Sequence, residues 1–296
     1  MNIAQRLERL PMTPTMNKVL LIVGIGWLFD AMDQGMVSGV LAAVGSDWVL
    51  SPLDQSMLAS AGTFGMIIGA AFSGIASDKW GRRKIILFTL LMYSVGSFLC
   101  GVSSSFTMLV VCRFITGLGL GGELPAASTL VSEFSPLKYR GRNVVLLESF
   151  WAWGWIIAAL VAYLLIPMYG WRIAFLVGAI PALFAAVFRV MVPESPRYLD
   201  LVGKHQQADE IVTKMETAAG VVVSDEEKTH LSAIKTSAWK SFAQLWSKKN
   251  LRATLVLWVI WFGINFGYYG FVLWTPSLLV AQGFSLVTSF GFTVIM

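Results

Sequence analysis

Seven stretches of predominantly apolar residues, each about twenty residues long or longer, divide this chain, and a helix of that length spans the ~30 Å hydrocarbon core of a bilayer. With 56% hydrophobic and only 13% charged residues, the 296-residue chain lacks the polar side chains that would cover a soluble protein of its size. We therefore predict an all-α polytopic membrane protein. Its spanning helices are expected at residues 18–44, 57–77, 85–102, 106–132, 144–166, 171–192 and 253–280.

An eighth apolar stretch begins near Ser285 and runs to Met296. Twelve residues of helix extend only about 18 Å, which is too short to cross a bilayer. We expect a six-helix transmembrane bundle at residues 1–192, a polar helical linker at 193–250, and an incomplete second bundle at 251–296 with one helix and part of another. The sequence thus predicts a missing C-terminal half.

Lysine and arginine are distributed unevenly among the connections. They cluster in the N-terminal tail, near residues 79–84 and 138–142, and throughout residues 197–252. The alternate connections contain none; these are residues 45–52, 101–105, 167–170 and 282–283. Because basic residues concentrate in cytoplasmic loops, we predict a multi-pass protein of the cytoplasmic (plasma) membrane whose N-terminus and linker are cytoplasmic.

Two helix starts can be identified within the linker. Ser195 and Pro196 have the residue types of an N-cap and a first helical position, which predicts a helix from there through Met215. Ser224 followed by Glu227 predicts a capping box at the start of a second helix.

Residues that would carry enzyme chemistry are scarce. Cys100 and Cys112 lie in apolar stretches without ligand spacing or a disulfide framework, so we interpret them as small apolar side chains. The sequence shows neither a nucleophile with its base nor a metal-ligand cluster, so we predict no enzyme activity, no metal and no cofactor. The net charge of +5 follows the cytoplasmic loops and therefore does not indicate nucleic-acid binding.

The connection after the second apolar stretch contains a charged motif. Asp78 lies where the helix ends, and a negative charge is unfavourable there unless it is paired. Gly81 permits a tight turn that places Arg82 and Arg83 to supply the partner. Basic anchoring alone would explain the arginines but not Asp78 and Gly81 at this spacing. The motif resembles the loop signature of the major facilitator superfamily, which implies that the aspartate and arginine latch neighbouring helices in one state of a transport cycle.

The resemblance extends along nearly the whole chain. Glu133 at the end of the fourth predicted helix, with Arg140 and Arg142 after it, is similar to a second acid-to-arginine latch of this family. Residues 193–197, Pro-Glu-Ser-Pro-Arg, resemble a signature of sugar porters and of organic cation and anion transporters. The runs at residues 119–133 and 146–151 are similar to bacterial niacin (nicotinate) permeases. The resemblance implies a six-helix bundle facing a second one, with substrate between them at mid-membrane.

Charged residues inside the predicted membrane helices are functional candidates, because burying them in lipid is costly. Asp30 and Asp33 share one face of the first helix, and Arg113 lies in the fourth. The helical rise puts Asp30 about 18 Å and Arg113 about 20 Å from the cytoplasmic side. We therefore predict an ion pair between Asp30 and Arg113 that proton uptake by an aspartate releases or re-pairs. An alternative for Asp33 is a hydrated position near the outer mouth.

Two glutamates and two tryptophans extend this set. Glu123 in the fourth helix and Glu148 in the fifth lie at similar depths, and each is a candidate for carrying a proton or lining the path. Trp151 and Trp155 are four residues apart and share a helix face. They predict an aromatic wall for the substrate, with plain packing as the alternative.

The seventh predicted helix contains a polar and aromatic run suited to holding a flat substrate, with Asn265, Tyr268 and Tyr269. Tyrosines also gather at membrane interfaces, so anchoring is an alternative role. A nicotinate anion is a flat aromatic carboxylate, and Arg113 with these aromatic residues would suit it chemically.

The resemblance implies a secondary active transporter that imports a small organic anion such as nicotinate by proton-coupled symport. Without the second bundle there is no opposing wall, so this chain alone is expected to be inactive. The fifth helix lacks the Gly-Pro motif typical of drug antiporters in the superfamily, which favours uptake. Expected partners are the small-molecule substrate, protons and the lipid bilayer. A transporter of sugars or other aromatic acids, and a membrane fragment that does not transport, stay open as alternatives. A seven-helix receptor would place its N-terminus outside, against the charge pattern.

Overall fold

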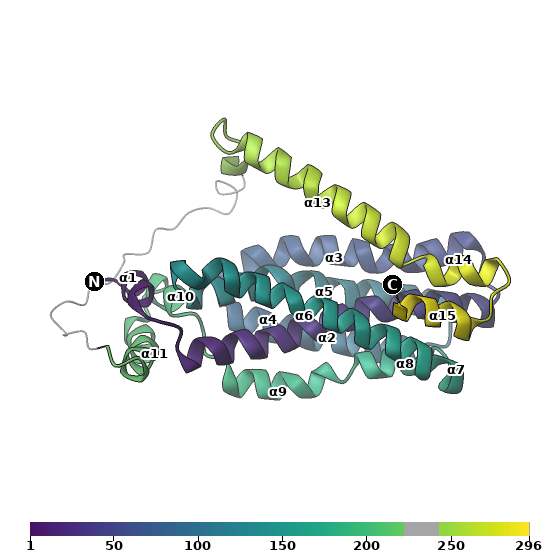
Figure 1. Ribbon diagram of the computed structural model, residues 1–296, viewed down its shortest axis with the longest axis horizontal. Helices are drawn as coiled ribbons and strands as arrows, with labels where there is room; N and C mark the ends of the chain where they lie inside the picture. The colour runs from purple at the N-terminus through teal and green to yellow at the C-terminus, as the bar shows by residue number, and fades with distance from the viewer. Residues whose placement is uncertain (222–242, 296) are drawn as a thin grey trace.

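The computed structural model describes residues 1–221 and 243–295, and every regular element in these ranges is a helix. The long helices lie side by side along the longest axis of the molecule (Figure 1). In chain order the elements are α1 (Ile3–Arg9), α2 (Pro14–Asp47), α3 (Pro52–Trp80), α4 (Arg82–Gly101), α5 (Phe106–Phe134), α6 (Leu137–Leu164), α7 (Ile166–Tyr169), α8 (Arg172–Gly178), α9 (Pro181–Met191), α10 (Pro196–Leu201), α11 (His205–Ala218), α13 (Leu251–Val272), α14 (Thr275–Ala281) and α15 (Leu286–Ile295). In the described ranges, 7 spans are long and apolar enough to cross a membrane, which confirms the predicted polytopic architecture.

Local sequence explains where the first two spanning helices begin. The Thr13 hydroxyl accepts a hydrogen bond from the Met16 N–H at 3.3 Å, and Pro14 occupies the first turn, where no N–H is needed. At the start of α3, Ser51 and Asp54 form a capping box in which each side chain accepts the backbone N–H of the other residue, at 3.2 and 3.1 Å.

Helix α5 lies at the centre of the bundle and packs against both α3 and α4, while α2 packs along α6. Glycines make the α3–α5 contact possible, because a β-carbon on any of them would overlap backbone atoms of the facing helix; they are Gly65, Gly69, Gly117 and Gly121. Small residues allow two helix backbones to approach closely in a membrane, where van der Waals packing drives association. The helix that carries Arg113 and Glu123 is therefore held tightly between its neighbours.

Two predicted membrane helices are interrupted. The sixth, predicted as one span, consists of α8 and α9, and α9 begins at Pro181. The seventh divides into α13 and α14, and Pro276 lies in the first turn of α14. Proline lacks the N–H that continues the hydrogen-bond ladder, and its ring collides with the preceding turn, so a helix is interrupted there.

The linker also differs from its prediction. Ser195 caps α10 as expected, with its hydroxyl accepting the Tyr198 N–H at 3.3 Å. The helix ends at Leu201 and does not continue to Met215, because Gly203 adopts a positive φ of 79° and turns the chain into α11. The second predicted linker helix, from Ser224, lies outside the described residues.

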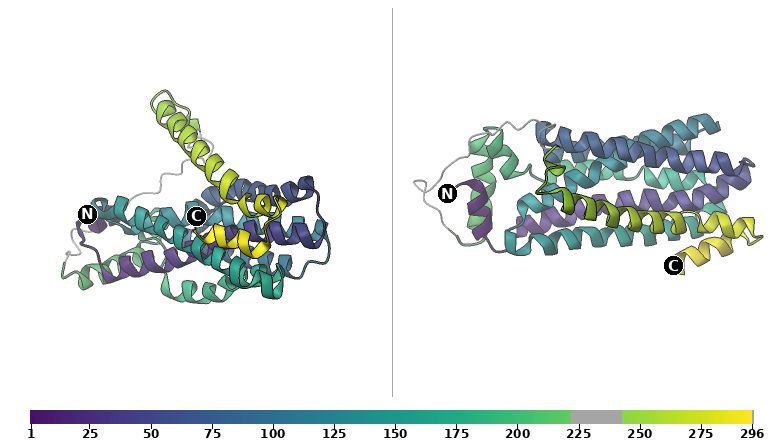
Figure 2. Two further views of the ribbon diagram at one scale, coloured as in Figure 1. Left: turned by 45° about the vertical axis from the view of Figure 1, so that its right-hand side comes forward. Right: turned by 90° about the horizontal axis from the view of Figure 1, so that it is seen from above.

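Different short helices lie at the two ends of the bundle. Helices α1, α10 and α11 gather at one end, which we call the α1 end (Figures 1 and 2). The opposite end carries α7, α14 and α15 (Figure 1). Helix α13 begins away from the bundle and approaches it toward α14 (Figure 1), so most of its apolar side chains are exposed.

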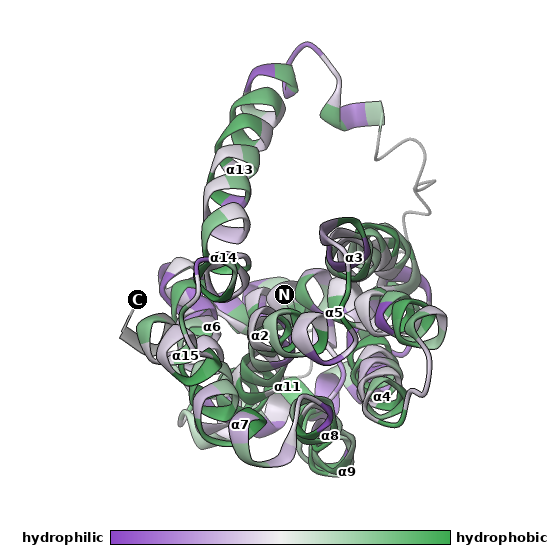
Figure 3. Ribbon diagram, turned by 90° about the vertical axis from the view of Figure 1, so that its right-hand side faces the viewer, coloured by the Kyte–Doolittle hydropathy of each residue, from purple (hydrophilic) through white to green (hydrophobic). Residues whose placement is uncertain are grey.

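The exterior of the bundle is apolar, whereas charges lie inside. Large apolar side chains on its outer face are highly exposed, among them Phe72 at 71% and Val190 at 84%. Figure 3 shows that hydrophobic residues make up much of the long helices, with hydrophilic residues between them. Asp30, Asp33 and Arg113, by contrast, are buried. This arrangement suits a protein whose outer surface contacts lipid.

Candidate functional site

The centre of the bundle contains a buried ion pair between α5 and α2. The Nη1 atom of Arg113 lies 2.7 Å from Oδ2 of Asp33, and the two side chains are 5% and 1% exposed. The Ser97 hydroxyl of α4 lies 2.8 Å from the other carboxylate oxygen, so Asp33 is compensated on both sides. Arg113 also lies over the Phe175 ring of α8.

This geometry corrects two predictions. Arg113 pairs with Asp33 and not with Asp30, because α2 and α5 are rotated so that Asp33 faces the guanidinium. Asp33 is also not a hydrated residue at an outer mouth, since it is almost completely buried.

Asp30 has a different partner. Its carboxyl group contacts Glu123 of α5, and both side chains are fully buried. The hydroxyl of Tyr93 on α4 faces Asp30. Glu148 is not part of this group: it is exposed on α6, where it faces the Trp27 indole. The structure therefore brings four of the five predicted charged residues together in two neighbouring pairs and leaves Glu148 apart.

The predicted aromatic residues lie along the contact between α2, α6 and α13. Trp155 meets Tyr268 edge to face with ring centroids 5.2 Å apart, and the Tyr269 hydroxyl donates a 2.7 Å hydrogen bond to Gln34 of α2. Trp151 lies against Trp27, with centroids 4.8 Å apart. Gln34 was missed in the sequence because its amide carries no charge pattern.

Two of these side chains have buried N–H groups that donate no hydrogen bond to any described residue. Among the described residues, neither the amide nitrogen of Gln34 nor the indole nitrogen of Trp155 has a hydrogen-bond partner, although both atoms are buried. The benzene-ring edge of Trp155 packs beside Gly35, the residue that follows Gln34 in α2. A buried donor without an acceptor is unfavourable, and a bound acceptor would relieve that cost.

Asn265 lies apart from this group. Its amide donates to the Trp261 carbonyl one turn earlier in α13, at 2.8 Å. It lines a cavity of about 300 Å³ between α3 and α13, together with Thr63, Phe64, Tyr269 and Trp274. The structure thus places Asn265 at a cavity wall that it shares with Tyr269.

The predicted latch at the α1 end is assembled around Arg82. Its Nη2 atom lies 2.8 Å from Asp78 and 3.1 Å from Glu133, which connects the end of α3 to the end of α5. Gly81 adopts a φ of 102°, which permits the turn that brings Arg82 back over Asp78. Arg83 donates its backbone N–H to Glu194 at 3.1 Å and its guanidinium to the Arg189 carbonyl.

The second latch differs from its prediction. Arg140 contacts Glu8 of α1 at 2.6 Å and not Glu133, because Glu133 is taken by Arg82. Arg142 is exposed, and no ion pair to it occurs within the described residues. Glu8 also binds Arg197 at 2.8 Å, so α1 bridges the bundle to the linker.

Two further interactions at this end were missed in the sequence. Arg6 is 1% exposed and binds Glu216 and Asp209 of α11 at 2.6 and 2.5 Å. Tyr198 donates to the Lys79 carbonyl at 3.0 Å, and its ring lies under Arg82. In the sequence, Arg6 looked like an ordinary basic anchor in the N-terminal tail, and Tyr198 looked like part of a helix start. Only the structure shows which residues they contact.

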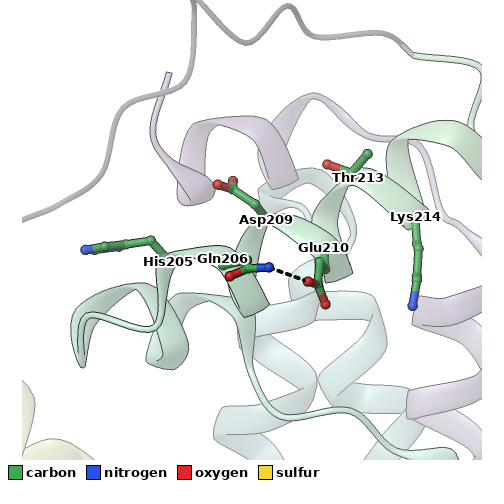
Figure 4. Close-up of a pocket in the computed structure, with 6 residues that line it drawn as sticks. All are labelled: His205, Gln206, Asp209, Glu210, Thr213 and Lys214. Carbon is green, nitrogen blue, oxygen red and sulfur yellow. Dashed lines mark hydrogen bonds between the residues drawn. The ribbon is translucent and has the colours of Figure 1, made fainter.

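A larger cavity of about 620 Å³ lies on α11, outside the bundle. Figure 4 shows its lining residues on one helix face, with Gln206 donating to Glu210. No residue predicted for substrate or proton lines it. Within the described ranges, no group of three potential metal ligands is present.

Comparison with known proteins places these features in context. A family model described as "Sugar (and other) transporter" matches residues 28–296. The niacin transporter NiaP of Acinetobacter baylyi is 46% identical over the whole chain, which spans 67% of that relative. A putative niacin/nicotinamide transporter NiaP of Bacillus subtilis is 39% identical over 94% of this chain and 62% of its own length. A benzoate transport protein of A. baylyi is 28% identical over 98% of this chain.

Solved structures show the same fold. A crystal structure of a double-tryptophan mutant of XylE matches 96% of this chain and 66% of its own with a TM-score of 0.67 and 22% identity. The major facilitator superfamily proton:xylose symporter XylE bound to a bromodeoxyglucose matches 69% of this chain and 51% of its own, with a TM-score of 0.62 and 24% identity.

Proposed function

Because the chain belongs to the sugar (and other) transporter family of the major facilitator superfamily, we propose that it forms the substrate- and proton-binding part of a secondary transporter for a small organic anion such as nicotinate. Its relatives are transporters and not enzymes, and the chain is a multi-pass membrane protein. The direction is import into the cell, driven by protons. Residues 1–192 are the first bundle, 193–250 the linker and 251–296 the start of the second bundle.

The observation that carries this proposal is the Arg113–Asp33 pair. In the described chain, Arg113 is the one cationic side chain buried in the middle of a spanning helix. Its charge is balanced by Asp33 at 2.7 Å, so it recruits a substrate anion only when that contact loosens. A buried arginine that can exchange one carboxylate for another is suited to an alternating transport cycle.

The aromatic group supports a flat substrate. Trp155, Tyr268 and Tyr269 offer ring faces and edges, and the unused donors of Gln34 and Trp155 point to an acceptor-rich ligand. An aromatic monocarboxylate has both a ring to stack and two oxygens to accept. A sugar lacks the aromatic ring and the charge, which makes it the weaker candidate here.

The orientation follows from the charges. The basic residues of α1, of the turn after α3 and of α10 and α11 lie at the α1 end, and basic residues concentrate in the cytoplasm. In this orientation the Arg82–Asp78–Glu133 cluster is a cytoplasmic latch that holds α3 to α5 in one state of the cycle.

Uptake of radiolabelled nicotinate by cells that lack their own nicotinate transport tests the proposal. The 296-residue chain is compared with a version extended by the remaining C-terminal part of the A. baylyi relative, each with and without an uncoupler. Uptake by either version that falls with the uncoupler and with Arg113→Ala supports the proposal. Equal competition by nicotinamide, which lacks the carboxylate, contradicts anion recognition. Absence of uptake from both versions overturns the proposed function.

A further inference from the structure

We propose that Asp30 and Glu123 share a single proton and together form the proton-binding site, separate from the Arg113–Asp33 ion pair. The role of this site in coupling rests on the proposed transport function. The shared proton itself follows from the geometry and can be tested without transport.

The two carboxyl groups are enclosed by three helices. Asp30 of α2 and Glu123 of α5 each have 0% exposure, and Tyr93 of α4 is also fully buried beside them. Gly26, one turn before Asp30, leaves room for the glutamate: a β-carbon there would lie 2.8 Å from Oε1 of Glu123. Glu123 therefore reaches across to the backbone of α2 and meets the carboxyl group of Asp30.

Neither carboxyl group has a donor if both are ionised. In the described part of the chain, none of their four oxygens has a hydrogen-bond partner. The Tyr93 hydroxyl faces Asp30 but completes no hydrogen bond either. Two adjacent buried carboxylates without a cation repel each other and lose their hydration, whereas one shared proton turns the contact into a hydrogen bond. A carboxyl pair of this kind holds one proton in preference to none.

The other charges nearby do not change this conclusion. The remaining titratable groups that act on Asp30 are Asp33 on its own helix and Tyr93 on α4. Asp33 adds negative charge, but Arg113 and Ser97 already satisfy it. Because Asp33 is compensated and the Asp30–Glu123 pair is not, the proton belongs to the pair.

The Asp30–Glu123 pair spans the contact between α2 and α5, so proton binding can be coupled to movement of these two helices. If the cycle moves these helices apart, the shared hydrogen bond is lost and each carboxyl group meets a different environment. The proton then leaves as the pair opens to water, and a new proton re-forms the pair on closing. No other reactant is required, because only a proton is taken up and released.

Infrared spectroscopy of the purified 296-residue chain in lipid nanodiscs tests the shared proton directly. A protonated carboxyl group gives a carbonyl stretching band that shifts in heavy water. We expect this band at neutral pH in the wild type, its loss in the double variant Asp30→Asn/Glu123→Gln, and its retention in Glu148→Gln, which removes an exposed acid from α6. A wild type without the band, or a double variant that keeps it in full, overturns the proposal.

A second variant tests the same contact independently, so that the proposal can still be decided if the double variant does not fold. Gly26→Ala retains both carboxyl groups but pushes the flexible end of Glu123 away from α2. We expect the carbonyl band to change frequency in Gly26→Ala and to stay unchanged in Gly263→Ala, where an added β-carbon meets nothing within 4 Å. An unchanged band in Gly26→Ala contradicts the close contact.

Transport in proteoliposomes separates the role in coupling from the proposed function. Counterflow of labelled nicotinate measures exchange without a proton gradient, and accumulation driven by a pH gradient measures coupling. Asp30→Asn is expected to retain counterflow and to lose accumulation. Accumulation that persists in this variant overturns the coupling role. Absent counterflow from both the 296-residue chain and its extended version overturns the proposed function and leaves the infrared result to decide the shared proton.

Discussion

Replacing Arg6 by alanine is expected to release the N-terminal helix from the linker. Arg6 donates two hydrogen bonds to Glu216, at 2.8 and 2.6 Å, and one to Asp209 at 2.5 Å. The guanidinium is 1% exposed and the Glu216 side chain 5%. The hydrogen bond with Glu216 raises the pKa of Arg6 although burial opposes this, so the pair is a fully charged one.

The size of the effect follows from what the substitution leaves behind. Arg6→Ala leaves the Glu216 carboxylate buried without its cation, and breaking a buried ion pair in this way costs about 3–5 kcal/mol. Each 1.4 kcal/mol changes an equilibrium constant about tenfold, so the open form of α1 should become about 100- to 4,000-fold more populated. Ile3 and Leu7 remain buried and keep the helix partly docked.

Hydrogen exchange of the α1 and α11 amides, measured by mass spectrometry on the chain in nanodiscs, checks this prediction. The matched control is Arg9→Ala, since Arg9 lies on the same helix but is exposed and has no ion pair in the described structure. Exchange in α1 and α11 should accelerate in Arg6→Ala while α5 remains protected. If both variants exchange at the same rate, the Arg6 cluster does not hold α1 in place and the reasoning is wrong.

Two further predictions concern packing and pH. Gly121→Ala places a β-carbon against the Met66 carbonyl, where the backbone cannot yield cheaply, so thermal unfolding should show a loss of about 1–3 kcal/mol that Gly263→Ala does not show. Burial opposes ionisation of Glu8, but the hydrogen bond from Arg197, the backbone N–H of residue 137 and the charge of residue 140 outweigh it and lower its pKa. A lowered carboxyl pKa stabilises the folded form above the ordinary value of 4.5 and loses this effect as pH falls through the folded value. After correction for the intrinsic exchange rate, which itself falls with pH, the protection of the α1 amides should therefore decrease in acid. Glu8→Gln should reduce that acid-dependent loss of protection, and an equal loss in the variant would contradict the role of this carboxylate.

The sequence predicted the spanning helices well because length and hydropathy decide them. A bilayer requires about twenty apolar residues in a helix whatever the partners are, so each span could be found without tertiary information. The same local logic found the Ser195 cap and placed Asp78 with Arg82, which are only four residues apart. Interactions that join distant segments, such as Arg6 with Glu216, depend on docking that no local pattern specifies.

The depth of a residue along its helix could not decide whether Asp30 or Asp33 pairs with Arg113. Three residues of helix rise only about 4.5 Å, less than one turn, so both acids match Arg113 within the precision of the estimate. The decision depends on how α2 and α5 are rotated about their axes, and hydropathy carries little of that information for helices that are buried on several sides.

Glycine spacing in α5 does carry that information. Gly117 and Gly121 follow Arg113 at intervals of four, so they share its face, and they pack on α3, where Arg113 passes Gly62. Gly119 and Glu123 form a second row four residues apart, and Gly119 packs on Tyr93 of α4. Close packing at the Gly117–Gly121 row and at Gly119 thus fixes the rotation of α5 against two neighbours at once. With that rotation set, the arginine and the glutamate emerge on different faces, so each meets a different aspartate of α2, and the ion pair and the carboxyl pair become separate sites.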